Sequence, residues 1–140
     1  MRRIRIVTKM QNEPEGPKRT SCRIPKDMLI SITKCMQVAG YSQRGRSKWI
    51  SESLTMLSDQ IESEPKEDRD YYFKLYDPVT SAADSITISL SESAYQTTKE
   101  WTTYIQDNDL GKDDAQTRFI HLAISMRLLS EGGQLVSSLG

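Results

Sequence analysis

The sequence predicts a mainly α-helical protein with a short two-stranded antiparallel β-ribbon, and three observations lead to this fold class. Residues 19–24 (RTSCRI) and 85–90 (SITISL) both alternate polar and apolar side chains, which is typical of a strand with one buried face. Two segments with apolar residues at three- and four-residue spacing follow each strand, as in amphipathic helices. The order strand–helix–helix therefore occurs twice in 140 residues, and such an internal repeat says more about the fold than any single motif.

The first strand–helix–helix unit is predicted over residues 19–61. Pro25 ends the strand and suits the start of a helix over residues 26–39, and Gly40 suits the C-terminal cap of that helix. A second helix is expected from about residue 47 to residue 61. The predicted apolar faces of these two helices contain Met28, Leu29, Ile32, Cys35 and Met36, followed by Trp49, Ile50, Leu54 and Leu57.

The second unit is predicted over residues 84–130. Ser91 suits the N-cap of a helix over residues 92–105, because its side chain can accept a hydrogen bond from the first turn. The following helix, 113–130, matches the second helix of the first unit. Its expected apolar face contains Phe119, Ile120, Ala123, Ile124, Met126 and Leu128.

Three segments lie outside these units. Residues 1–18 are predicted to form a basic N-terminal arm and linker, residues 62–83 an acidic and aromatic linker with a short extended piece at 71–76, and residues 131–140 a flexible tail. The aromatic residues of the linker could stack on nucleic-acid bases or pack on the neighbouring domain, and we favour packing. They are Tyr71, Tyr72, Phe73 and Tyr76. The two cysteines, Cys22 and Cys35, make no disulfide framework and are expected to be small buried side chains.

A net charge of zero conceals two oppositely charged halves. Residues 1–60 hold 12 basic and 5 acidic residues, a net charge of +7, and residues 61–140 hold 7 basic and 14 acidic residues, a net charge of −7. This asymmetry favours a polyanionic partner for the basic half. It is also consistent with attraction between the two halves.

Neither unit is long enough to bury a core alone. We therefore expect the two strands to pair antiparallel within one chain, with the four helices beneath them; pairing of like units between chains is the alternative. Such a ribbon has one apolar face against the helices and one polar face toward solvent. A two-stranded ribbon fits the major groove of B-DNA, where every base pair presents a distinct pattern of donors and acceptors.

The segments RTSCRIPKDML and SITISLSESAY resemble the opening of the MetJ/Arc-type ribbon-helix-helix DNA-binding proteins. GYSQRGRSKWISESL resembles the turn and second helix of that family. Two units in one chain resemble the TraY-like accessory proteins of conjugative plasmids. The resemblance implies a tandem ribbon-helix-helix protein of prokaryotic, phage or plasmid origin.

The resemblance also implies residue roles. Base-reading side chains would be Arg19, Ser21, Arg23, Ser85, Thr87 and Ser89, on the solvent face of the ribbon. DNA phosphates would be held by Arg44, Arg46, Ser47, Lys48 and Lys112, near the starts of the second helices. The loop 107–114 departs from the family pattern because it carries four aspartates, which repel phosphate.

We therefore expect a sequence-specific protein that binds double-stranded DNA and acts as a transcriptional repressor or regulator. The alternatives are a plasmid relaxosome or partition accessory protein, and an antitoxin-like adaptor that contacts another protein through the acidic segments 61–70 and 107–114. A second copy on an adjacent DNA site is a further expected partner. We expect no signal peptide and no membrane span, hence a cytoplasmic protein associated with the nucleoid or a plasmid.

Enzymatic activity is not expected. The single histidine, His121, is interpreted as a helix-surface or interface residue, and the sequence offers no nucleophile–base pair, phosphate-binding glycine loop or metal-ligand cluster. No cofactor and no metal are predicted.

Overall fold

The computed structural model describes residues 18–76, 83–111 and 114–139, with side chains described as far as residue 131. Within these residues the chain is mainly helical and contains a two-stranded antiparallel sheet, as predicted. The elements in order are β2 (Lys18–Pro25), α1 (Lys26–Ala39), α2 (Arg46–Glu62), α3 (Lys66–Leu75), β3 (Ala83–Leu90), α4 (Glu92–Asp107) and α5 (Ala115–Leu139).

Strands β2 and β3 come from distant parts of the sequence and pair along their whole lengths, from Lys18 opposite Leu90 to Pro25 opposite Ala83. The predicted pairing within one chain is thus confirmed. One face of the ribbon is buried, as the alternating pattern requires. The buried side chains on that face are Cys22, Ile24, Ile88 and Leu90.

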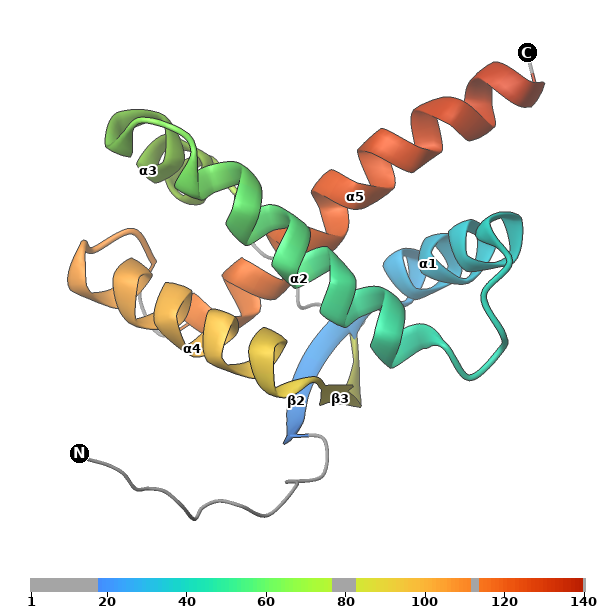
Figure 1. Ribbon diagram of the computed structural model, residues 1–140, viewed down its shortest axis with the longest axis horizontal. Coiled ribbons are helices and arrows are strands. Elements are labelled where there is room, and N and C mark those ends of the chain that lie inside the picture. Colours follow the sequence, from blue (N-terminus) through green and yellow to red (C-terminus); the bar gives the residue numbers. More distant parts are fainter. Residues whose placement is uncertain (1–17, 77–82, 112–113, 140) are drawn as a thin grey trace, which may run out of the picture.

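The helices lie against the buried face of the ribbon, and α2 and α5 cross near the centre of the molecule (Figure 1). Helix α4 packs against both α2 and α5, whereas α1 lies on the other side of the crossing, against α5 and α2. Trp49 and Ile50 of α2 and the corresponding Phe119 and Ile120 of α5 have no exposed surface. The two second helices therefore share one core through residues at equivalent repeat positions.

The helix ends confirm the capping predictions. Gly40 follows α1 with a φ of 85°, and its N–H bonds to the carbonyl of Gln37, so glycine suits the left-handed conformation here. The hydroxyl of Ser91 accepts a hydrogen bond from the N–H of Ala94 at 3.1 Å and caps α4.

One prediction about the remaining segments is wrong. Residues 66–75 form α3, where an extended piece at 71–76 was expected. Pro65 precedes the helix, Glu67 and Asp68 lie in its first turn, and these features favour a helix N-terminus over a strand. Residues 131–139, expected to be a flexible tail, continue α5 as far as Leu139.

The aromatic residues of α3 explain why this helix forms. The ring of Phe73 is fully buried, 5.9 Å from the ring of Trp101 and 6.5 Å from that of Phe119, measured between centroids. The prediction that the aromatic residues pack on the neighbouring part of the protein is therefore confirmed for Phe73. The side chain of Tyr71, in contrast, is 59% exposed. Both cysteines are buried and unpaired, as predicted.

Several predictions fall outside the described residues. These are the arm up to residue 17, residues 77–82 of the linker, Lys112 and the last residue of the tail. Across the segments that the structure does describe, none of the helices combines the length and the apolar character that crossing a membrane requires.

Candidate nucleic-acid interface

The outer face of the ribbon gathers all six residues that the sequence analysis assigned to base reading. The antiparallel register places them directly opposite one another as three cross-strand pairs. These pairs are Arg19 with Ser89, Ser21 with Thr87, and Arg23 with Ser85. Five of the six side chains are exposed and Ser89 is half-buried, so the face carries two cations on β2 and hydroxyl groups on both strands.

The backbone groups of these residues point to the outer edges of the ribbon and not across it. The N–H of Ser89 donates to the hydroxyl of Ser47 at 3.0 Å, and the carbonyl of Arg23 lies 2.7 Å from Nε2 of His121. The three outward-facing pairs are therefore non-hydrogen-bonded pairs, in which opposite Cα atoms approach to about 4.5 Å. This brings their side chains close together on a narrow polar surface.

The two edges of the ribbon are covered by different helices. The start of α2 covers the edge of β3, where Ser47 binds Ser89. Helix α5 covers the edge of β2, where His121 binds the carbonyl of Arg23 and the Gln116 side chain reaches the carbonyl of Ser21 at 3.5 Å. These contacts satisfy backbone groups that a free strand edge leaves unpaired.

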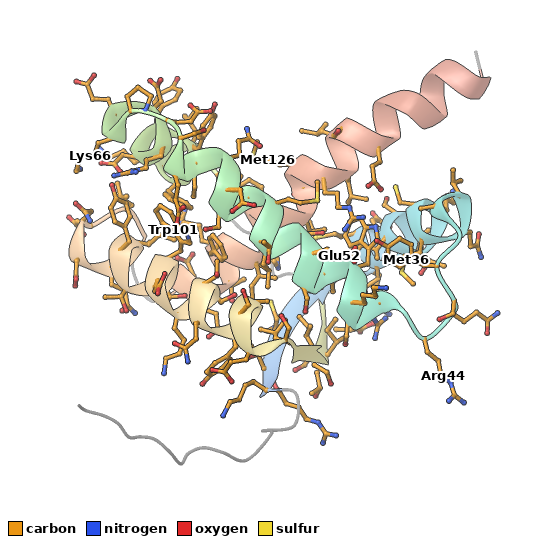
Figure 2. The ribbon with its side chains drawn as sticks, in the orientation of Figure 1. Met36, Arg44, Glu52, Lys66, Trp101 and Met126 are labelled. Carbon is orange, nitrogen blue, oxygen red and sulfur yellow. The ribbon has the colours of Figure 1, made fainter. Side chains whose placement is uncertain are left out.

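The residues at the start of α2 form a basic surface beside the edge of β3. Arg44 and Lys48 are exposed and Arg46 is half-buried, and Figure 2 shows Arg44 projecting away from the body of the molecule. Gly45 is the N-cap and no side chain caps this helix, in contrast to α4. The positive end of the helix dipole and three cations therefore coincide, an arrangement that favours an anion.

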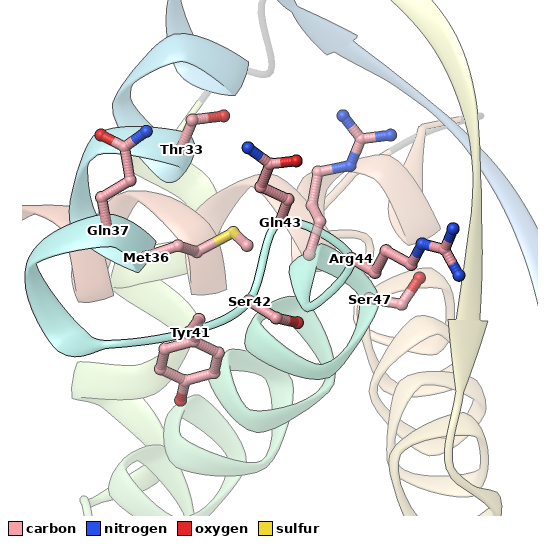
Figure 3. A pocket seen from close by; sticks show the side chains of 9 residues that line it. Thr33, Met36, Gln37, Tyr41, Ser42, Gln43, Arg44 and Ser47 are labelled. Carbon is pink, nitrogen blue, oxygen red and sulfur yellow. The ribbon is translucent and has the colours of Figure 1, made fainter.

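Ser47, which is predicted to contact a phosphate, also makes a contact within the protein. Its oxygen accepts the N–H of Ser89, so the residue fixes the start of α2 to the ribbon; Figure 3 shows Ser47 beside strand β3. Its hydroxyl proton is still able to donate to another group. Sequence spacing gave no sign of this contact, because the two residues lie 42 positions apart.

A cavity of about 440 Å³ lies behind the basic turn, between the end of α1 and the start of α2 (Figure 3). Polar side chains dominate its lining, and both arginines of the turn contribute to it. The lining residues are Thr33, Met36, Gln37, Tyr41, Ser42, Gln43, Arg44, Arg46 and Ser47.

A buried arginine on α5 supports the start of α2, and sequence analysis did not single it out. Nη1 of Arg127 donates to the carbonyl of Trp49 at 2.9 Å, and the guanidinium lies 4.4 Å from the centre of the Trp49 ring. Nη2 donates to the hydroxyl of Tyr41 at 3.1 Å, and Nε donates to Glu131 at 2.8 Å. Arg127 thereby joins three segments: α5, the first turn of α2, and the turn that carries Arg44.

The charge of Arg127 is maintained despite burial. Burial disfavours the guanidinium cation, but hydrogen bonds with Glu131 and Tyr41 outweigh this and raise the pKa of Arg127 above its ordinary value. Tyr41 also hydrogen-bonds Glu52, and the ammonium of Lys48 lies 6.0 Å from the centre of the Tyr41 ring. The basic surface is thus built on a connected polar network.

The corresponding end of α5 is chemically different. Asp107 and Asp109 are exposed in the preceding loop, and Asp114 is half-buried beside Arg118. Arg118 is itself buried and donates to the carbonyls of Phe73 and Tyr76. The described residues at this end therefore present carboxylates, in agreement with the doubt raised by the four aspartates in the sequence.

His121 is fully buried at the contact between α5 and β2, so the interface position is confirmed and the alternative of a helix surface is wrong. Because a carbonyl is an acceptor, Nε2 carries the proton that bonds the Arg23 carbonyl, while the buried Nδ1 has no hydrogen-bond partner among the described residues. Burial lowers the pKa of His121, so the imidazole is neutral near pH 7. Within the described residues, no group of three or more potential ligands among His, Cys, Asp and Glu could hold a metal ion.

Comparisons of the chain with protein-family models, with curated proteins and with solved structures gave no match. Conclusions about function therefore depend on the ribbon, its edges and the charges around them.

Proposed function

We propose that this protein binds double-stranded DNA sequence-specifically by placing the outer face of the β2–β3 ribbon in the major groove. The observation that carries the proposal is the set of three cross-strand polar pairs on the solvent face of a ribbon whose other face is buried. Arginine can bind O6 and N7 of guanine together, and serine and threonine can pair with several bases.

Under this proposal the two strand–helix–helix segments are tandem ribbon-helix-helix units of a single-chain regulator, most simply a transcriptional repressor. A relaxosome or partition accessory protein would use the same surface. The start of α2 would hold a phosphate through its free N–H groups, with Arg44, Arg46 and Lys48 supplying the charge.

The test is selection from a pool of random duplexes, followed by affinity measurements over a range of salt concentrations. A reader of duplex DNA retains a subset of sequences, and the logarithm of its affinity falls linearly with the logarithm of salt concentration. Replacing Arg44, Arg46 and Lys48 by alanine should weaken binding to all duplexes alike and flatten this slope. Retention of no duplex at low salt would rule the proposal out.

A second candidate function is contact with a protein through the acidic segments, and the surface of α3 favours it. Tyr71 and Leu75 lie one turn apart on this helix and are 59% and 63% exposed. The exposed acidic residues Glu67 and Asp68 lie on the same helix. Such a surface suits a partner with basic and apolar side chains, and an adaptor of this kind would show little duplex binding at any salt concentration.

A further inference from the structure

The ribbon has two chemically unequal edges, and this inequality bears on how DNA would be held. The edge of β3 adjoins the start of α2, through the contact of Ser47 with Ser89. The edge of β2 adjoins α5, through the contacts of His121 and Gln116. A ribbon lying face-down in the major groove directs each edge toward one of the two sugar–phosphate backbones that border the groove.

The charge at the two edges is opposite. The sequence from Gly40 to Lys48 holds three basic and no acidic residues, and α2 begins there without a side-chain cap. The loop 107–114 holds four aspartates and one lysine, Lys112. The last aspartate of this loop, Asp114, directly precedes α5, whose residues Gln116 and His121 contact the edge of β2, so its carboxylate disfavours a phosphate there.

The two cations proposed to read bases lie on β2, whereas the basic edge is the edge of β3. Arg19 and Arg23 belong to β2, whereas β3 offers Ser85 and Thr87 on the same face. The hydroxyl-bearing strand is therefore the one beside the basic edge. The arginines lie on the strand whose edge adjoins the start of α5.

We infer that the protein binds DNA in a single fixed orientation, with a phosphate clamp on one backbone only, at the β3 edge. Its site lacks twofold symmetry, and guanines contacted by Arg19 and Arg23 lie on the side of the site away from the clamped backbone. This inference rests on the proposed function and specifies the geometry of the same surface.

The experiment is phosphate-ethylation interference on both strands of a selected duplex, with the full chain. Modifications that block binding should cluster on one strand beside the reading site, and Lys48→Ala should remove a contact from this cluster. Blocking modifications of equal strength on both strands, related by a twofold axis, would overturn the inference and leave DNA binding intact. Failure to retain any duplex would instead count against the proposed function.

A matched pair of variants gives an independent measurement. Lys48→Ala should lower the slope of log affinity against log salt concentration by about 1, the value for one lost phosphate contact. Lys112→Ala should leave the slope unchanged. Equal losses in both variants would show that both edges hold phosphate and would overturn the inference.

Neutralising the acidic edge tests the role of repulsion. Asp114→Asn, which keeps a side-chain oxygen for Arg118 and removes the negative charge at the start of α5, should raise affinity for all duplexes by the same factor. Asp59→Asn, which neutralises an exposed residue toward the end of α2, is the control and should not change affinity. A loss of affinity in Asp114→Asn would contradict the assigned repulsion.

Discussion

The two strand–helix–helix halves of the molecule have the same order of elements and nearly the same core positions, yet their second helices begin in opposite chemical surroundings. Helix α2 begins without a side-chain cap among Arg44, Arg46 and Lys48, whereas α5 begins after a loop rich in aspartate. The equivalent positions beneath them, Trp49 and Phe119, are both fully buried. The two halves thus share an apolar framework but differ in their polar surfaces.

The first helices differ as well. Helix α4 has a serine cap and places Trp101 in the aromatic cluster, where its indole N–H donates to Ser58 at 2.9 Å. Helix α1 follows Pro25 with no side-chain cap and leaves Ile30 and Val38 more than half exposed. Both halves therefore contribute large side chains to the interior, whereas the first half supplies the basic surface.

The largest expected effect tests whether the equivalent core positions contribute equally to the free energy of unfolding. Trp49→Ala and Phe119→Ala should each lower the free energy of unfolding by about 3–5 kcal/mol, because each leaves a large cavity. Urea denaturation measures this. Leu129→Ala, at a site 77% exposed, is the control and should change stability by no more than about 0.5 kcal/mol. A tolerated alanine at either core position would break the equivalence.

The next effect concerns a residue that only the second half has. Arg127 corresponds by the 70-residue offset to Leu57, so Arg127→Leu makes the halves alike at this position. It should cost about 1.5–3 kcal/mol of stability through lost charge-assisted hydrogen bonds. Arg127→Lys should restore only part of this, because lysine lacks the planar fork. Full stability in Arg127→Leu, measured by urea denaturation, would show that the network contributes nothing.

The comparison of the two strands predicts unequal contributions to DNA affinity. Arg23→Ala should cost about 1–3 kcal/mol of specific binding, as for one lost bidentate base contact, and Thr87→Ala should cost less. Titration of a selected duplex measures both. Lys34→Ala, at an exposed position of α1, is the control. Unchanged affinity and sequence preference in Arg23→Ala would show that the ribbon does not read the bases.

The smallest expected effect is a pH dependence of the free energy of unfolding, which comes from His121 at the β2 edge of the ribbon. The pKa of His121 is lowered in the folded protein, so the unfolded state binds more protons as the pH falls below the ordinary histidine value near 6.5. The free energy of unfolding should therefore decrease from pH 7 toward pH 5. His121→Gln keeps a donor for the Arg23 carbonyl and should remove this part of the dependence. An identical pH profile in both proteins would contradict the assignment.

Local rules predicted the strands and most helices, because alternation and helical spacing are visible in the sequence and the caps at Gly40 and Ser91 are local. Helix α3 was missed because the aromatic residues around Phe73 suggested a strand, while the burial that fixes them depends on distant Trp101. The network of Arg127 joins residues 78 positions apart, which no spacing rule reveals. The one signal for this network in the sequence was the presence of a charged residue, Arg127, beside the apolar positions of α5.

The six outer-face positions of the ribbon were predictable for the same local reason. What surrounds them was not: the contacts of Ser47 and His121 with the strand edges follow from how the helices cross. Sequence reasoning left His121 at either a helix surface or an interface, because its neighbours Ile120 and Leu122 do not show what the imidazole faces. Its burial depends on the carbonyl of Arg23, 98 positions away.

Because β2 and β3 belong to one chain, formation of the ribbon is a unimolecular step. A ribbon shared between two chains exists only above the dissociation constant of the dimer, and its stability depends on protein concentration. Here dilution does not separate the strands, so a single molecule carries a complete ribbon. The number of complete ribbons in a cell would then rise in direct proportion to the number of chains synthesised. For a ribbon shared between two chains, it would rise with the square of that number at low abundance.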